Sequence, residues 1–172
     1  MHQGLAAFQA IGAQLSRTAF LALLAESYGK SGQAEEGLGV LAEALAAADK
    51  TGERLYEAEI HRLKGELTLR LNAGGRTPQT GPNSRTPNPR AVAQEAEAYF
   101  LKAIEVAREQ QAKSLELRAT ISLSRLWRQQ RRMADAWALL SETYGWFTEG
   151  FDTVDLKEAK SLLQELAQEA PH

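Results

Sequence analysis

Few residues of this chain have the types and spacing that chemistry requires, and the clearest pair is Glu57 and His61. These side chains are four residues apart, so on a helix they share a face and could hold a metal ion. The other two histidines, His2 and His172, lie at the chain ends, and the sequence indicates no further ligand. We therefore interpret His61 as a packed histidine beside a helical neighbour, and predict no metal site.

The sequence also lacks the motifs of nucleotide and nucleophile chemistry. It contains no phosphate-cradling loop of the form GxxxxGK[ST], and its paired glycines, Gly74 and Gly75, precede a proline-rich segment rather than a helix N-terminus. Cysteine is absent, and no serine or threonine lies in a nucleophile-elbow context. We predict no catalytic residue and no cofactor.

Basic residues gather in the segment SRLWRQQRRMADAW, which carries Arg125, Arg128, Arg131 and Arg132. Arg125 and Arg128 are three residues apart and share a helix face, while Trp127 points elsewhere. Cations in the last turn of a helix favour its dipole, which accounts for some of them. Because the net charge of the chain is only -2, we predict neither nucleic acid nor a membrane surface as a partner.

The elements that must position these residues are helices. Of the 172 residues, 44% are hydrophobic, mostly Ala and Leu, and apolar residues recur at helical spacing almost throughout. The sequence predicts one all-α domain, 1–172, with about eight helices, at 3–14, 17–30, 33–49, 53–72, 91–110, 113–129, 133–147 and 153–168. It shows neither a signal peptide nor a membrane-spanning run, so we expect a cytoplasmic protein.

One segment interrupts the helical pattern. Residues 72–90 read NAGGRTPQTGPNSRTPNPR and hold four of the five prolines, with no acidic residue. Such a composition cannot bury enough apolar area to offset its ordering entropy, so we predict a flexible loop over 73–90. It is interpreted as an insertion within the domain, with a dock for an acidic partner or RNA as the alternative.

Helix pairs share one pattern when they are superposed. The first helices align small residues midway along, and the turn follows seven residues later: Ala25, Gly65 and Ser124, then Gly32, Asn72 and Arg131. The second helices align three positions. The first is small (Gly37, Ala96, Ala136), the second, four residues later, is large (Leu41, Phe100, Leu140), and the third, three residues after that, is small again (Ala44, Ala103, Thr143). Small side chains at a crossing let two helices approach closely, and the large residue fills the gap between neighbours.

This pattern resembles the tetratricopeptide repeat, with Gly37 in place of Ala and Arg131 in place of the turn Gly as departures. The resemblance implies a right-handed array of antiparallel helix pairs. Its parts are 1–15 (second helix of an incomplete repeat), 17–49 (repeat 1), 53–110 (repeat 2, interrupted by the loop), 113–147 (repeat 3) and 153–169 (capping helix).

A second resemblance extends over nearly the whole chain. The phrases LALLAESYGKSGQAEEGL, AEIHRLKGELTLRL and AEAYFLKAIEVAREQQAKSLELRATISLSRLW resemble the helical C-terminal region of large bacterial predicted ATPases, signalling proteins that often carry a class III adenylate cyclase or a DNA-binding domain. It implies a regulatory region, either a fragment of a longer polypeptide or a stand-alone relative. No ATPase or cyclase activity is implied, because the corresponding domains are not in this sequence.

In the repeat type that the chain resembles, first helices line a concave groove. The repeat register places Glu26, Lys30, Glu59, Arg62, Glu66, Arg70, Arg118, Ile121, Arg125, Arg128 and Gln129 there, so we expect a groove that is mixed in charge at one end and strongly basic at the other. We predict a non-catalytic protein-interaction module that binds a segment of another protein, acidic or C-terminal, or of its own parent chain. An idle solvated face, a sensor pocket for a small anionic ligand and a homodimer formed through an uncovered first helix remain alternatives.

The segment YGWFTEGFDTVDLKEAKSLL places three aromatics before the last helix. We predict that Trp146, Phe147 and Phe151 form a packed seam beneath that helix, with Asp152 as its N-cap, rather than a ligand site. The apolar side of the helix is expected to be Val154, Leu156, Ala159, Leu162, Leu163 and Leu166.

Overall fold

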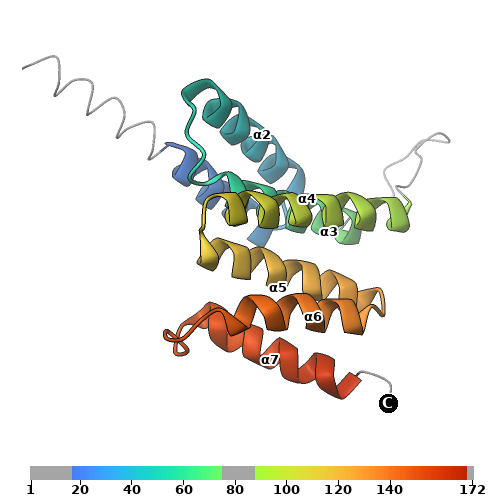
Figure 1. Cartoon of the computed structure of the whole chain (residues 1–172). Helices are drawn as coiled ribbons and strands as arrows, with labels where there is room; N and C mark the ends of the chain where they lie inside the picture. The colour runs from blue at the N-terminus through green and yellow to red at the C-terminus, as the bar shows by residue number, and fades with distance from the viewer. Residues whose placement is uncertain (1–16, 75–87, 170–172) are drawn as a thin grey trace, which may run out of the picture.

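The computed structural model describes residues 17–74 and 88–169, and all regular elements in these ranges are helices. They are a helix over residues 17–30, α2 (Ala34–Thr51), α3 (Glu57–Gly74), α4 (Pro89–Glu109), α5 (Lys113–Gln129), α6 (Met133–Gly145) and α7 (Val154–Glu169) (Figure 1). The prediction of an all-α chain is confirmed for these residues. The helix expected at 3–14 lies outside the described residues.

The helices form a stack in which each packs against the next in sequence (Figure 1). In addition, α3 contacts α5, and α5 contacts α7. In the described part of the chain, α2, α4 and α6 make no close backbone contact with one another. The helices α3, α5 and α7 therefore form one layer whose members contact one another along the stack, and we call it the tied layer. The helices α2, α4 and α6 form a second layer, whose members, within residues 17–74 and 88–169, are connected only through the first.

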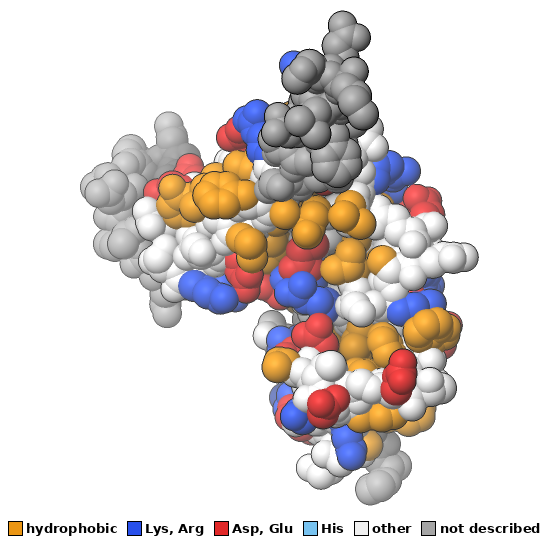
Figure 2. Space-filling model, turned by 90° about the vertical axis from the view of Figure 1, so that its left-hand side faces the viewer, with side chains coloured by type: hydrophobic (Ala, Val, Ile, Leu, Met, Phe, Trp, Pro, Cys, Tyr) orange, Lys and Arg blue, Asp and Glu red, His pale blue; other side chains and the backbone are white. Residues whose placement is uncertain are grey.

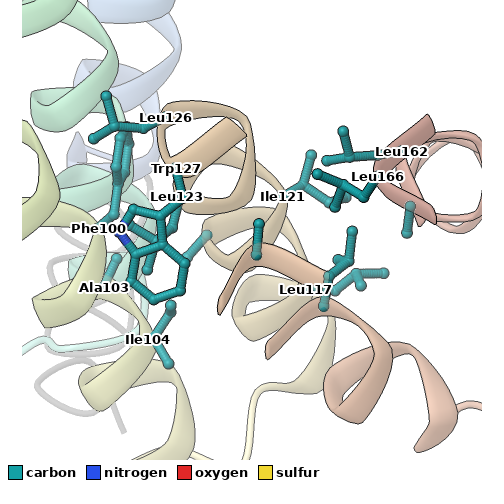
Figure 3. Packing of buried hydrophobic residues seen from close by; sticks show 14 of the residues in the cluster. Phe100, Ala103, Ile104, Leu117, Ile121, Leu123, Leu126, Trp127, Leu162 and Leu166 are labelled. Atoms are coloured by element: carbon teal, nitrogen blue, oxygen red, sulfur yellow. The ribbon is translucent and has the colours of Figure 1, made fainter. Parts of the chain in front are cut away.

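The hydrophobic core divides along this stack. One cluster joins the helix of residues 17–30, α2 and α3, and includes Leu21, Leu41 and Leu67. The larger cluster joins α4 to α7. Figure 3 shows Phe100 and Ile104 of α4 beside Leu123, Leu126 and Trp127 of α5, and Ile121 of α5 facing Leu162 and Leu166 of α7.

Small residues lie at the helix crossings, as the repeated pattern predicts. A Cβ atom at Gly65 would come within 2.5 Å of Cε1 of Phe100, so only glycine lets α3 and α4 approach this closely. In the next pair, the Ser124 hydroxyl donates a hydrogen bond to the Ala136 carbonyl at 3.3 Å. The aligned residues of the second helices are all buried: Gly37, Ala96, Ala136, Leu41, Phe100, Leu140, Ala44, Ala103 and Thr143.

Three turns share one backbone geometry, and one expected turn is absent. Gly32, Gln111 and Arg131 all have left-handed φ values, of 81°, 53° and 63°. At each turn the following amide donates to a carbonyl five residues back; the Arg132 amide donates to the Trp127 carbonyl at 2.8 Å. Asn72, in contrast, was expected at a turn, but it lies within α3, which continues to Gly74.

The bounds expected for the loop, 73–90, are wrong at both ends, because α3 continues to Gly74 and α4 begins at Pro89; residues 75–87 lie outside the described ranges. At its end, Asn88 caps α4: its side-chain oxygen accepts a hydrogen bond from the Arg90 amide at 3.0 Å, and Pro89 occupies the first helical position. An Asn-Pro pair is a helix start as well as a loop signal, which explains the difference.

None of the helices within residues 17–74 and 88–169 combines the length and hydropathy needed to cross a lipid bilayer.

Candidate functional site

The predicted groove residues lie on helices that contact one another in the tied layer. We call them the charged strip: Glu26 and Lys30 on the helix of residues 17–30, Glu59, Arg62, Glu66 and Arg70 on α3, and Arg118, Arg125 and Arg128 on α5. On α3 the spacings of three, four and four residues place all four side chains on one face. On the face drawn in Figure 2, acidic and basic side chains lie side by side between hydrophobic areas.

Arg62 is the centre of the strip. Its Nε and Nη2 donate to the two carboxylate oxygens of Glu59 at 2.9 and 2.7 Å, and its Nη1 donates to Glu66. Glu59 and Arg62 are only 8% and 7% exposed. Burial opposes the charge on Arg62, but the hydrogen bonds to Glu59, together with the charges of Glu59, Glu66 and Glu26, outweigh burial and raise the pKa of the guanidinium above its usual value. The bidentate contact therefore fixes the position of the Arg62 guanidinium against the Glu59 carboxylate.

Arg118 connects this centre to α5 and α7. Its Nη2 lies 3.0 Å from Oε1 of Glu59, and its Nε lies 4.0 Å from Asp155 on α7. One helical turn further along α5, the Ser122 hydroxyl donates to Glu66 at 3.0 Å. Along each pair of contacting helices, the residue numbers increase in the same direction from one contact to the next. The helices α3, α5 and α7 therefore run parallel to one another.

The end residues of the strip are more exposed. Nζ of Lys30 lies 2.9 Å from Glu26, and Nη2 of Arg70 lies 3.7 Å from Glu66. The hydrogen bond from Lys30 lowers the pKa of the Glu26 carboxyl, with the charges of Arg62 and Arg118 adding to it against a smaller effect of burial. Glu26 is thus within the electrostatic reach of α3 and α5.

The basic end that we expected is neutralised by α7. Nη2 of Arg125 lies 2.7 Å from Glu158, while Arg128 donates to Glu169 at 3.0 Å and also binds Glu165. No partner was predicted for these glutamates from the sequence. The available signal was a row of basic residues at helical spacing on α5 (Arg118, Arg125, Arg128) and a row of acidic residues at helical spacing on α7 (Asp155, Glu158, Glu165). Because α5 and α7 run parallel, the two rows meet.

One expected groove residue lies elsewhere. Ile121 is 3% exposed and packs in the core between α5 and α7 (Figure 3), so it does not line the strip. Gln129 is exposed, beside Arg125 and Arg128.

A cavity of about 210 Å³ opens beside the strip. Its apolar wall consists of Ala19, Ala22, Leu23, Tyr56 and Leu63, and its charged wall of Glu26, Glu59 and Arg118. The cavity therefore combines an apolar surface with a buried carboxylate and a half-buried guanidinium, as an anchor for a side chain would.

The aromatic seam before the last helix is only partly formed. Trp146 and Phe151 are 59% and 47% exposed, and Lys113 lies over the Trp146 ring at 5.4 Å, so the expectation that they pack beneath α7 is wrong. Trp146 continues the register of exposed Glu142, whereas Phe147 continues that of buried Thr143 and packs against the core.

The start and the apolar face of α7 also differ from expectation. The helix begins at Val154, so Asp152 is not adjacent to it, and the Thr153 hydroxyl donates to the Gly150 carbonyl at 2.8 Å. Val154 is 76% exposed rather than packed. Leu156, Ala159, Leu162 and Leu166 are buried as predicted, and Leu163 is partly buried.

Glu57 and His61 do lie on one helix face, but their geometry is that of a packed pair. Nε2 of His61 is 4.0 Å from Glu57, whose carboxylate is bound by Nε of Arg54 at 2.6 Å. Burial lowers the pKa of His61, so its ring is neutral at pH 7. Within the described ranges, no group of three His, Asp or Glu side chains is placed to hold a metal ion.

Comparison with known proteins adds no relative: no family model, no curated protein and no solved structure matches this chain.

Proposed function

We propose that this chain is a helical-repeat module of the tetratricopeptide type that binds a segment of another protein without catalysing a reaction. The observation that carries the proposal is the continuity of the charged strip across the helix of residues 17–30, α3 and α5. A surface that presents fixed charges of both signs beside an apolar cavity suits an extended segment with polar and apolar side chains in alternation.

The repeat assignment is supported by the crossings and by the helix contacts. Close approach at Gly65 and at Ser124 falls at aligned positions of two pairs. Contacts along α3, α5 and α7, without contacts among α2, α4 and α6 in the described ranges, support a solenoid whose first helices form the inner face. We assign the repeats to 17–49, 53–110 and 113–147, with 153–169 as the cap.

The partner that fits best carries a carboxylate next to an apolar side chain. Arg118 is the strip cation at the cavity mouth, and about one third of its side chain is exposed. A partner carboxylate at Arg118 would replace water rather than the Glu59 contact, because a guanidinium has five donors. The apolar side chain would then enter the cavity against Leu23 and Leu63.

Binding to selected peptides tests this proposal. Peptides are selected from a random library on the wild-type chain, and their Kd is measured by fluorescence anisotropy. Replacing Arg118 by Ala should weaken binding about tenfold or more, since charge-assisted hydrogen bonds contribute about 1.5–3 kcal/mol. Arg108→Ala is the matched control: Arg108 is also one of two cations on a buried glutamate, Glu116, but it lies outside the strip. Equal effects of the two variants would contradict binding at the strip.

We further propose that the partner is a domain of the same signalling system, as the resemblance to the C-terminal region of bacterial predicted ATPases implies. If the reading frame upstream encodes nucleotide-binding and cyclase or DNA-binding domains, those domains are the first partners to test. Binding of purified parent domains that Arg118→Ala weakens and Arg108→Ala spares would support this assignment.

A second copy is the other candidate partner. Phe20 and Leu23, three residues apart on the helix of residues 17–30, are 64% and 63% exposed. Sedimentation over a concentration series measures self-association. A monomer at millimolar concentration would exclude a stable homodimer.

A further inference from the structure

A second cavity, separate from the one beside Arg118, lies where α5 ends and α6 begins. Its volume is about 590 Å³, and Arg125, Arg128 and Arg131 all line it, with Met133 of α6 and Glu169 of α7. We propose that this cavity binds a terminal phosphate group. The cavity shares Arg125 and Arg128 with the strip, but Arg131 and Met133 lie outside it, so substitution of Arg131 tests this inference separately from peptide binding at Arg118.

The chemistry of the cavity matches a phosphate better than a single carboxylate. One guanidinium already satisfies the two oxygens of a carboxylate, whereas a phosphate presents three strong acceptor oxygens and close to two negative charges. Three guanidinium groups in one cavity supply donors for each of these oxygens.

The third guanidinium belongs to Arg131, whose backbone adopts an unfavourable conformation. Arg131 has a φ of 63°, in the left-handed region that favours glycine, and it occupies the turn position where the first helix pair has Gly32. Gln111 adopts the same conformation at the turn between α4 and α5, with a φ of 53°. This second turn has one arginine, Arg108, at the position that corresponds to Arg128, and it provides an internal comparison.

The present counterions of the cavity can be exchanged. Arg125 and Arg128 pair with Glu158, Glu165 and Glu169 of α7, and all five side chains are at least one third exposed. Exposed ion pairs are weak because water screens them. Arg131 makes no ion pair with a carboxylate of residues 17–74 or 88–169. Glu169, at the end of α7, is the carboxylate that lines the cavity, so it is the one that a phosphate would displace.

The start of α6 adds to the positive potential. Arg132, at its N-cap position, makes no capping hydrogen bond through its side chain, which instead binds Glu97 and Asp135. Among the residues that the structure describes, the N-cap residue therefore offers no side-chain acceptor to the first amides of α6, which begin at Met133 in the cavity wall.

Phosphate binding is measured by titrating the full chain with inorganic phosphate at constant ionic strength, followed by NMR chemical shifts. Replacing Arg131 by Gly should weaken binding about tenfold, the loss expected for charge-assisted hydrogen bonds. This variant keeps the turn, because glycine suits its φ. Gln111→Gly is the matched control and should bind phosphate as the wild type does. Glu169→Gln removes the competing carboxylate and should strengthen binding.

Titration with three further ligands distinguishes the possible sources of the phosphate group: a nucleoside monophosphate, a phosphoserine peptide and the unphosphorylated peptide. Tighter binding of the nucleotide assigns the cavity to a small metabolite, and tighter binding of the phosphopeptide assigns it to a modified partner. The proposal is overturned if phosphate shows no saturable binding, or if Arg131→Gly and Gln111→Gly bind it equally.

Discussion

The guanidinium of Arg118 lies 3.0 Å from Oε1 of Glu59, a carboxylate that Arg62 binds through two hydrogen bonds. A carboxylate only 8% exposed is thus shared between a cation of its own helix, α3, and a cation of α5. Because an unpaired buried charge is costly, this arrangement fixes the relative position of the two helices, and with it one wall of the cavity beside the strip.

Removing the central cation should destabilise the fold. In Arg62→Met, Glu59 retains only Arg118, and we expect the free energy of unfolding to fall by about 3 kcal/mol. Urea unfolding followed by circular dichroism measures this. Arg54→Ala, which removes an exposed cation from Glu57, should leave the midpoint nearly unchanged. An unaltered midpoint in Arg62→Met would contradict the structural role of the pair.

Two glycine substitutions should have opposite effects. Gly65→Ala brings a Cβ atom to 2.5 Å from Phe100, and we expect a loss of about 1–3 kcal/mol from overpacking. Gly39→Ala, in α2, meets nothing within 4 Å and should gain about 0.5–1 kcal/mol because alanine favours the helix. Thermal unfolding of the two variants side by side checks the prediction. Similar melting temperatures would show that α3 and α4 do not cross closely at Gly65.

Acid should destabilise the protein through Glu116. Burial favours its neutral form, but hydrogen bonds from Lys113 and Arg108 prevail and lower the pKa of Glu116 below its usual 4.5. A carboxyl whose pKa is depressed by folding contributes stability above pH 4.5, and this contribution is lost as the pH falls through the folded-state value. Urea unfolding between pH 7 and pH 3 should therefore show a smaller decline in Glu116→Gln than in the wild type. Parallel curves would refute the contribution.

Two of the three tryptophans should differ in their importance for stability. Trp146 is 59% exposed, so Trp146→Ala should change stability by no more than about 0.5 kcal/mol. Trp127 is 9% exposed and donates from Nε1 to Glu97 at 2.7 Å, so Trp127→Ala should cost about 3–5 kcal/mol. Chemical denaturation measures both changes. A large loss in Trp146→Ala would restore the packed seam that the exposure of its ring excludes.

The sequence predicted features that depend on neighbours along the chain. The expected helices at 17–30 and 113–129 agree with the structure, since periodicity and turn signals are local. The α-helical class and the small residues at the crossings follow from the same kind of information. Asn72 was misplaced because the residues after it lack an apolar pattern, although α3 continues through them.

Features that depend on the rotation of one helix against another were not predicted. The pairing of Arg125 with Glu158, and of Arg128 with Glu165 and Glu169, requires that α7 lie parallel to α5 with its acidic face turned toward it. Neither condition can be read from one helix alone. Ile121 was placed in the groove by a repeat register that did not distinguish the inner face from the adjoining core face.

The division of the core into two clusters has a consequence for the cavity beside Arg118. The cluster around the helix of residues 17–30 and α2 includes residues of α3 but none of α4 to α7, so we expect it to open locally while α4 to α7 keep their core. Ala19 and Leu23 line the cavity from that first helix, and Arg118 lines it from α5. We therefore expect one local opening to raise the amide exchange rates of the helix of residues 17–30 and α2 and to widen the cavity.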